Sequence, residues 1–295
     1  MLSIIIVNWN VRSLLERCLN SIWQNQPSMP YEVIIIDNNS RDGSQDFLES
    51  ISKKFDNLKI IFNNQNLGFA RACNQGFKKS KGEIILFLNP DTEILLNSLD
   101  IAIDHLKKDS SAGILGGQII DEEKETQASV RSFPDVFSQA LILLKLHNLF
   151  PRTKVFKKYF LSDFDYQKQQ AVDQVMGACL LIKRELMEKL HGFDEKFFLW
   201  FEEVDLCYRA KKLNYQVVYD PEIKVKHLGH QSFFKISPLK KQKIYNRSLI
   251  YYFRKHHPFW QAIFLACLTP LSLLMSFFVQ LFYPWLKNYY VSRRY

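Results

Sequence analysis

Short apolar runs alternate with helical patterns through the first third of the chain, and this alternation limits the possible folds more than any other feature. The runs are rich in β-branched residues and too short for helices, which is typical of strands buried on both faces. Strands that alternate with helices predict an α/β fold with a mostly parallel sheet and flanking helices. The four predicted strands lie in the stretches LSIIIVNWN, YEVIIIDNNSRDGS, LKIIFN and GEIILFLN, the second of which ends in a polar turn.

Polar side chains stand where three of these strands end, and ligands bind at the carboxyl ends of strands in such sheets. Pro90 fixes its own φ and restrains the residue before it, so the carboxylate of Asp91 is held in one direction. A hard divalent cation needs few protein carboxylates when substrate phosphates supply its other oxygens, which makes Asp91 a candidate ligand. An Asp in such a turn also has a purely structural interpretation. The strand-end residues are Asn8, Asn10, Asp37, Asn39, Asn89 and Asp91.

The loop after the first strand excludes the common nucleotide-binding motifs. It reads NWNVRS, whereas a dinucleotide-binding fold requires G-x-G-x-x-G at this place, and a P-loop is also absent. A nucleotide would therefore be held without a glycine cradle. Asp37 at a strand end could instead accept hydrogen bonds from ribose hydroxyls or from a base N–H.

A second acidic cluster lies within residues 192–215, near the start of a predicted helix. Glu203 lies on the apolar side of this helix, Glu202 lies somewhat further round, and Asp205 is one turn before Arg209, with which it can pair. Partial burial would raise the pKa of Glu203 toward the range useful for a general base. Acids are also common at helix N-termini for electrostatic reasons alone. The apolar positions of the helix are Leu206, Ala210 and Leu213.

A histidine follows the strand-like segment 215–226. His227 stands at the end of that predicted strand and is a candidate metal ligand, although His230, three residues later, is an alternative. The five cysteines are scattered and form no CxxC pair, which favours reduced thiols in a cytosolic protein.

Seven stretches of the chain together resemble one family, the inverting GT-A glycosyltransferases of family 2, and most closely its bacterial rhamnosyltransferase-like branch. They cover roughly residues 2–232 in the family's order. The resemblance implies the GT-A fold, which is Rossmann-like with a mostly parallel sheet. The stretches are SIIIVNWN, VIIIDNNSRDGS, NLGFARACNQG, LFLNPDTE, MGACLLIKRE, GFDEKFFLWFEEVDLCYR and KHLGHQS.

The resemblance also implies roles for individual residues. Asp91 and His227 would bind a divalent cation, Mg²⁺ or Mn²⁺. Glu203 would be the catalytic base, with Glu202 and Asp205 beside it in the same motif. The family usually has Asp where this chain has Glu203 and Gly where it has His230. The residues implied to bind the nucleotide-sugar donor are Asn8, Asn10, Asp37, Asn39, Arg71, Asn74 and Asn89.

The C-terminal part of the chain differs from the rest. The net charge of the chain is +9, yet Ile223–Tyr295 contains no Asp or Glu, and Pro258–Leu286 contains no charged residue at all. The apolar stretch is long enough to span a bilayer. Pro270 lies inside it and would kink a helix. A kinked spanning helix, a hairpin or in-plane pair, and a buried helical pair are all compatible with this pattern.

These observations predict three parts: a GT-A domain at 1–235, a basic and aromatic amphipathic linker helix at 236–257, and a membrane-associated segment at 258–295. They predict attachment to the cytoplasmic face of the plasma membrane, and no nucleic-acid-binding motif is present. The predicted reaction is transfer of a sugar, rhamnose or another hexose, to a lipid-linked oligosaccharide or glycan acceptor of a bacterial surface polysaccharide. The alternatives are a nucleotidyltransferase and an inactive sugar-nucleotide binder. The oligomeric state is not fixed by the sequence.

Overall fold

The computed structural model describes residues 1–228 and 236–291, with side chains to residue 281. His230 therefore lies outside the described residues. The strands are β1 (Leu2–Asn8), β2 (Tyr31–Asp37), β3 (Leu58–Phe62), β4 (Ile84–Leu88), β5 (Thr92–Ile94), β6 (Ala112–Ile120), β7 (Val130–Arg131), β8 (Gln170–Val172), β9 (Gln174–Val175), β10 (Cys179–Lys183) and β11 (Gln216–His227). The helices are α1 (Arg12–Gln24), α2 (Ser44–Ser52), α3 (Phe69–Lys79), α4 (Ser98–Lys108), α5 (Val136–Leu143), α6 (Leu146–Leu149), α7 (Lys154–Phe160), α8 (Arg184–Lys189), α9 (Glu202–Lys212), α10 (Pro238–His256) and α11 (Phe259–Val291).

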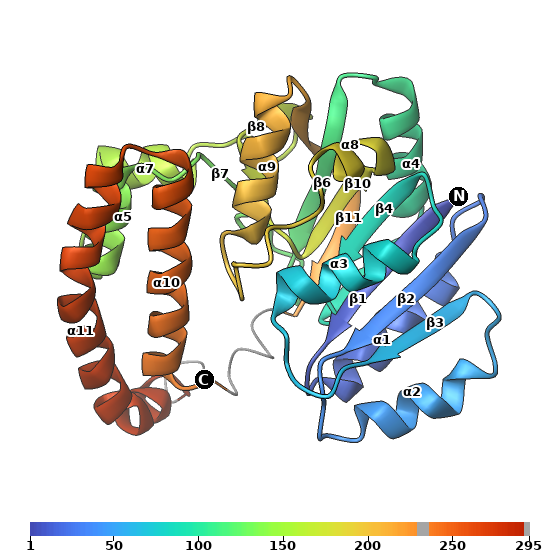
Figure 1. Ribbon diagram of the computed structural model, residues 1–295, viewed down its shortest axis with the longest axis horizontal. Helices are drawn as coiled ribbons and strands as arrows, with labels where there is room; N and C mark the ends of the chain where they lie inside the picture. The colour runs from blue at the N-terminus through green and yellow to red at the C-terminus, as the bar shows by residue number, and fades with distance from the viewer. Residues whose placement is uncertain (229–235, 292–295) are drawn as a thin grey trace.

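Within the described residues, nine strands form the central sheet, in the order β3-β2-β1-β4-β10-β6-β11-β5 with β8 paired to β11 (Figure 1). The four strands predicted from the first third of the chain are mutually parallel neighbours. The α/β prediction is therefore confirmed. Beyond β4 the sheet is mixed, because β10 is antiparallel to both of its neighbours and β5 and β8 are antiparallel to β11.

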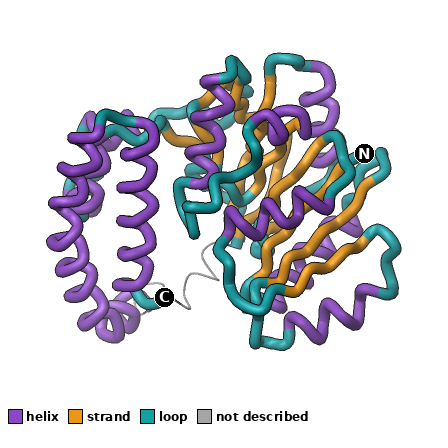
Figure 2. The backbone as a smooth tube through the Cα atoms, viewed as in Figure 1, coloured by secondary structure: helices purple, strands orange, loops and turns teal. Residues whose placement is uncertain are grey.

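Helices cover both faces of the sheet, as the tube in Figure 2 shows. Apolar side chains of α1, α2 and α4 pack on one face, and those of α3, α8 and α9 pack on the other. Alternate residues of β1 divide between the two cores: Ile4 and Ile6 belong to the first, and Ile5 and Val7 to the second. This explains why β1 has an apolar run without a polar face.

The Asn-Pro-Asp-Thr sequence forms a tight turn between β4 and β5. The backbone N–H of Thr92 donates to the carbonyl of Asn89 at 3.2 Å, which closes a four-residue turn with Pro90 in second place. Thr92 then pairs with His227 in the antiparallel β5–β11 ladder. The turn therefore carries the end of β4 across to the end of β11.

A separate helical unit is attached beside the sheet. α10 and α11 lie side by side as an antiparallel pair, and α5 packs against α11 (Figure 1). α11 continues through Pro270 as one helix over its described length, so the apolar segment does not form a hairpin within itself. Its stretch Phe259–Leu281 is long and apolar enough to cross a membrane and is mostly exposed. The domain boundaries predicted from the sequence remain a prediction.

Candidate active site

A cavity of about 280 Å³ opens at the carboxyl ends of β1 and β4. Asp91, His227 and Glu203 all line it, although they come from widely separated parts of the chain. Glu202 and Asn89 also line it. The cavity therefore brings together the candidate metal ligands and the candidate base.

Asp91 and His227 form a buried pair on the floor of this site. The Nε2 atom of His227 lies 3.4 Å from Oδ1 of Asp91, and each residue is 6% exposed. The backbone N–H of Leu228 donates to the carbonyl of Asp91 at 2.9 Å, which fixes the two strand ends together. The amide of Gln127 donates to the carbonyl of His227, and its oxygen lies 3.2 Å from Nδ1. In the neutral ring this contact places the proton on Nδ1 and leaves the lone pair of Nε2 directed at Asp91.

Glu202 and Glu203 are two adjacent carboxyl groups at the start of α9. Burial raises the pKa of Glu203, and the charge of nearby Arg131 opposes that rise. Burial, followed by the charge of Glu203, raises the pKa of Glu202 well above its usual range. The Oε2 atom of each has no hydrogen-bond partner among the described residues. A buried carboxylate oxygen without a partner is costly, and both residues line the cavity.

The backbone before α9 is strained. Trp200 and Phe201 have φ of 65° and 69°, a region that bulky residues rarely occupy. The carbonyl of Phe198 accepts from the N–H of Phe69 at 2.8 Å, and the carbonyl of Leu199 accepts from Ser248 Oγ at 2.8 Å. The loop 198–201 is thus fastened to α3 on one side and to α10 on the other, which sets where α9 begins.

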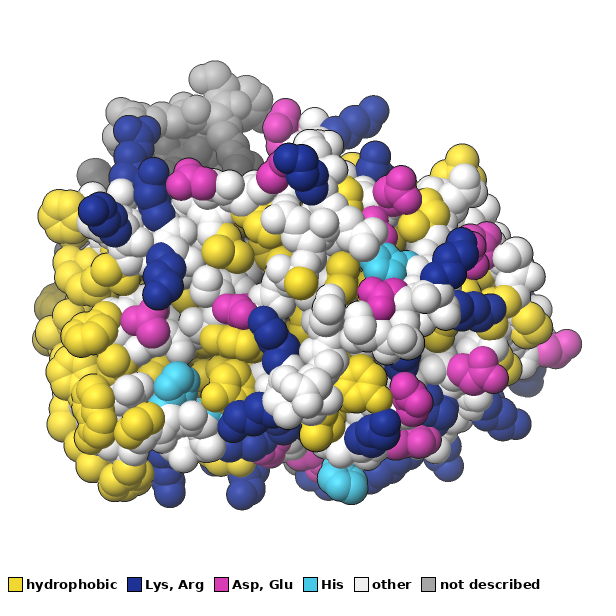
Figure 3. Space-filling model, turned by 90° about the horizontal axis from the view of Figure 1, so that it is seen from above, with side chains coloured by type: hydrophobic (Ala, Val, Ile, Leu, Met, Phe, Trp, Pro, Cys, Tyr) yellow, Lys and Arg dark blue, Asp and Glu magenta, His cyan; other side chains and the backbone are white. Residues whose placement is uncertain are grey.

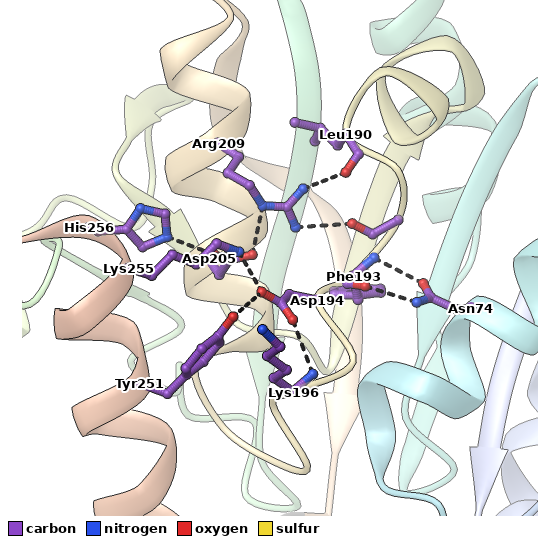
Figure 4. A network of polar contacts seen from close by, with 11 residues as sticks. Asn74, Leu190, Phe193, Asp194, Lys196, Asp205, Arg209, Tyr251, Lys255 and His256 are labelled. Carbon is purple, nitrogen blue, oxygen red and sulfur yellow. Dashed lines mark hydrogen bonds and ion pairs between the residues drawn. The ribbon is translucent and has the colours of Figure 1, made fainter.

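Asp205 does not line the cavity. Its carboxylate is fully buried and accepts hydrogen bonds, each at 2.7 Å, from Arg209 Nε and from His256 Nε2, while Lys255 Nζ lies at the same distance (Figure 4). The predicted pairing with Arg209 is confirmed. The predicted catalytic role finds no support in this geometry, because both carboxylate oxygens are already bound between α9 and α10.

The predicted donor residues at the ends of β1 and β2 form a hydrogen-bonded cluster beside the cavity. Asn8 Nδ2 donates to Asp37 Oδ2 at 2.8 Å, and the other oxygen of Asp37 accepts from the N–H of Ser40 and from Gln45. Asn10 Oδ1 accepts from the N–H of Arg41. Asn10 and Asn39 have positive φ, which Asn tolerates better than most residues. Asn38, between Asp37 and Asn39, is the member of this loop that lines the cavity.

Two predicted donor residues on α3 are engaged elsewhere. Both polar atoms of the Asn74 amide bind the backbone of Phe193, each at 2.9 Å (Figure 4). A Cβ on Gly192 would lie 2.6 Å from Asn74 Oδ1, so the chain needs glycine there. Arg71 is half exposed and pairs with Glu195 at 3.7 Å. The structure gives Asn74 a structural contact in place of the expected donor contact.

Comparison with known proteins decides the family. The family model of Glycosyl transferase family 2 matches residues 3–190. This chain belongs to that family. The N-acetylglucosaminyl-diphospho-decaprenol L-rhamnosyltransferase of Mycobacterium tuberculosis is 26% identical over 77% of this chain and 75% of the relative. The rhamnosyltransferase WbbL of Escherichia coli K12 is 26% identical over 79% of this chain and 87% of the relative.

The fold of this family 2 glycosyltransferase is shared with solved enzymes. The mannosyltransferase PcManGT of Pyrobaculum calidifontis, solved with GDP-Man and Mn²⁺, superposes with a TM-score of 0.59 at 17% identity, covering 93% of this chain and 72% of that protein. The predicted GT-A architecture and the predicted family are both confirmed.

The sequence reasoning missed some residues of the glycosyltransferase site. Arg131 on β7 lines the cavity, and its charge acts on Glu203. Trp9 and Trp200 add aromatic walls. Arg131 belongs to a two-residue strand whose sequence has no periodic pattern, so only the folded chain places it here.

The donor set of the glycosyltransferase fits a divalent cation that also binds substrate phosphates. No cluster of three or more metal-binding side chains exists in the described part of the chain, so a cation held by protein alone is not built in. A buried carboxylate beside an imidazole nitrogen with a free lone pair supplies two ligands suited to Mn²⁺, and the carboxylate also suits Mg²⁺.

Proposed function

We propose that this chain is an inverting glycosyltransferase that transfers a sugar, rhamnose or another hexose, from a nucleotide-sugar donor to a lipid-linked acceptor. One observation carries the proposal: Glu203, whose buried Oε2 atom has no partner among the described residues, and a buried Asp–His pair line the same cavity. Inversion at an anomeric carbon requires one general base and no protein nucleophile. The cavity offers that combination.

Glu203 is the proposed base. It accepts the proton of an acceptor hydroxyl, whose oxygen attacks the anomeric carbon while the bond to the nucleoside diphosphate breaks. Burial raises the pKa of Glu203, which strengthens it as a proton acceptor, and the charge of Arg131 opposes that rise. Burial and the charge of Glu203 raise the pKa of Glu202 well above its usual range.

Asp91 and His227 are the proposed cation ligands. When bound, a divalent cation neutralises charge on the leaving diphosphate. The proposed nucleoside subsite is the cluster of Asn8, Asn10 and Asp37 beside the cavity, with Asn38 at its wall. Hydrogen bonds within the cluster hold these side chains in place before a donor arrives.

The proposed acceptor is an oligosaccharide on a lipid diphosphate, in the assembly of a bacterial surface polysaccharide at the cytoplasmic face of the plasma membrane. The mycobacterial relative is named for a lipid diphosphate acceptor, N-acetylglucosaminyl-diphospho-decaprenol. The exposed apolar helix α11 supports a membrane location. The described cysteines are unpaired, and four of them are buried, which agrees with a reducing compartment.

The test is transfer from a panel of labelled nucleotide sugars to lipid-linked acceptors, with and without EDTA. The variant Glu203→Gln removes the base without changing its size, and kcat is expected to fall by about 10²–10⁴-fold. Donor binding, followed by calorimetry, is expected to persist. Glu188→Gln, an exposed acid outside the cavity, is the matched control and should behave as wild type.

Two results would contradict the proposal. If Glu203→Gln retained the wild-type rate, Glu203 would not be the base. If the wild-type protein bound a nucleotide sugar but turned over none of the panel with any acceptor, the chain would be an inactive binder.

A further inference from the structure

The exposed side of α11 is apolar, unlike that of a helix on the surface of a soluble protein. Its outward positions are large and apolar and follow helical spacing, whereas its buried positions include two serines, Ser272 and Ser276. Figure 3 shows hydrophobic side chains gathered over the end of the molecule that this helical unit forms. We call the outward positions the apolar stripe. They are Trp260, Ile263, Phe264, Leu271, Leu274 and Phe278, each between 43% and 58% exposed.

Polar contacts hold the inner face of α11 to α10. Ser276 Oγ donates to Gln242 Oε1 at 3.2 Å, and Gln280 Oε1 accepts from the N–H of Leu239 at 3.3 Å. Gln242 in turn donates to Asn246 at 2.7 Å. These bonds join one end of the pair, where α10 begins. Nearer the other end, Ala262 and Leu265 of α11 belong to the same buried apolar cluster as Leu249 and Phe253 of α10.

α10, which packs along α11, carries a row of exposed cations. Lys240, Lys243, Arg247 and Arg254 are exposed and recur at helical spacing, and α10 contains no acid. Among the described residues, the ion pairs of α10 are made by Lys255 and His256 and not by these four. We call these four residues the basic row.

We propose that the apolar stripe and the basic row form one docking surface for an anionic lipid bilayer, with α11 lying in the plane of the membrane. The apolar stripe enters the boundary between headgroups and acyl chains, and the basic row contacts lipid phosphates. This proposal rests on the proposed function only for its biological setting, since membrane binding is measured without any transfer of sugar.

The packing argues against a spanning helix. A bilayer that enclosed α11 would also enclose α10, which lies alongside it, and the basic row would then stand in hydrocarbon. In the plane of the membrane the same cations meet headgroups instead. The charge of the row also selects an anionic lipid surface as the occupant, because a second copy of this chain would bring the same cations together.

Flotation with sealed vesicles tests the surface. The full chain is expected to bind vesicles of phosphatidylcholine with phosphatidylglycerol, and to bind pure phosphatidylcholine more weakly. Ile263→Glu with Leu274→Glu is expected to lower the bound fraction about tenfold or more. The matched control is Leu96→Glu with Leu213→Glu, two leucines of the catalytic part that are 75% and 45% exposed and should bind as wild type.

The basic row has its own matched control. Lys240→Gln, Lys243→Gln and Arg247→Gln together should abolish the preference for anionic vesicles, while Lys53→Gln, Lys54→Gln and Lys107→Gln remove equal charge elsewhere and should preserve it. Equal losses in both triple variants would overturn the role of the row. If the wild type formed a dimer in the absence of vesicles and the variant with Ile263→Glu and Leu274→Glu did not, a second copy of the chain and not lipid would cover the apolar stripe.

Protease protection separates the in-plane helix from a spanning one. In sealed inside-out membrane vesicles from an expressing bacterial host, a C-terminal tag should remain cleavable from outside without detergent. Protection of the tag would place the two ends of α11 on opposite sides and overturn the in-plane arrangement. Transfer activity is measured on the same vesicles, so a failure of membrane binding and a failure of catalysis are read separately.

Discussion

Glu203 and Asp205 lie on the same helix, but replacing the carboxyl group by an amide should lower kcat at Glu203 and lower Tm at Asp205. Asp205→Asn keeps the size of the side chain but removes a charge that Arg209, His256 and Lys255 all contact. Breaking a buried ion pair costs about 3–5 kcal/mol. In the variant, Arg209 still donates to the carbonyls of Leu190 and Gly192, and Lys255 still donates to Asp194. The expected loss in free energy of unfolding is therefore the lower limit, about 3 kcal/mol.

Thermal unfolding measures this loss. At roughly 2–4 °C per kcal/mol for a chain of this size, Asp205→Asn should lower Tm by about 6–12 °C. The matched control is Asp104→Asn, which breaks an exposed pair with Lys108 at the same helical spacing and should cost less than about 0.5 kcal/mol. Glu203→Gln should leave Tm unchanged or raise it, while its kcat falls.

The pH dependence gives a second test of Asp205. Burial alone would raise the pKa of its carboxyl, but the hydrogen bond from His256 and the charges of Arg209 and Lys255 lower it below its usual range. A depressed pKa stabilises the fold above the unfolded pKa of about 3.9 and ceases to do so as the pH falls through the folded value. The Tm difference between wild type and Asp205→Asn should therefore be largest near neutral pH and shrink in acid. A variant with wild-type Tm and no transfer would refute this reasoning and return Asp205 to the chemistry.

Two further predictions concern the cavity. Because the pKa of Glu202 is raised in the folded state, the wild type loses stability as the pH rises. The Tm of Glu202→Gln minus that of the wild type should therefore increase from pH 5 to pH 8. If this Tm difference stayed flat or fell, the buried position of Glu202 would be contradicted. Mn²⁺ with a nucleoside diphosphate should raise the Tm of the wild type, and Asp91→Asn should abolish this rise. The control Asp56→Asn, on the surface, should keep it. If Asp91→Asn showed the same rise as the wild type, Asp91 would not be a cation ligand.

The sequence predicted the site where local rules and tertiary structure agree. Asn8 and Asp37 were both predicted at strand ends where a ligand binds, and the two residues are partners in the β1–β2 ladder. The prediction of which side of α9 is apolar is largely confirmed, since Leu206 and Ala210 are buried and Glu203 lines the cavity. Leu213 is 45% exposed because the helix ends before it.

Other features depend on contacts between distant segments. The contact of Asn74 with Phe193 crosses 119 positions, and no spacing rule connects them. Asp205 was placed correctly beside Arg209, but its partners His256 and Lys255 belong to a helix that the sequence linked only to lipid. Arg131 reaches the cavity from a strand of two residues, which is too short to have a periodic pattern.

The four-residue turn between β4 and β5 fixes the number of residues that can connect these two strands. Its two ends belong to ladders held independently, β4 on β1 and β5 on β11. One inserted amino acid in β5 would shift the register by one place and reverse which side chains point to each face. The imidazole of His227 would then lose its neighbour. Insertions should therefore be tolerated in the exposed loop 121–125 and rejected between Leu88 and Thr92, a pattern that a library of single-codon insertions would reveal.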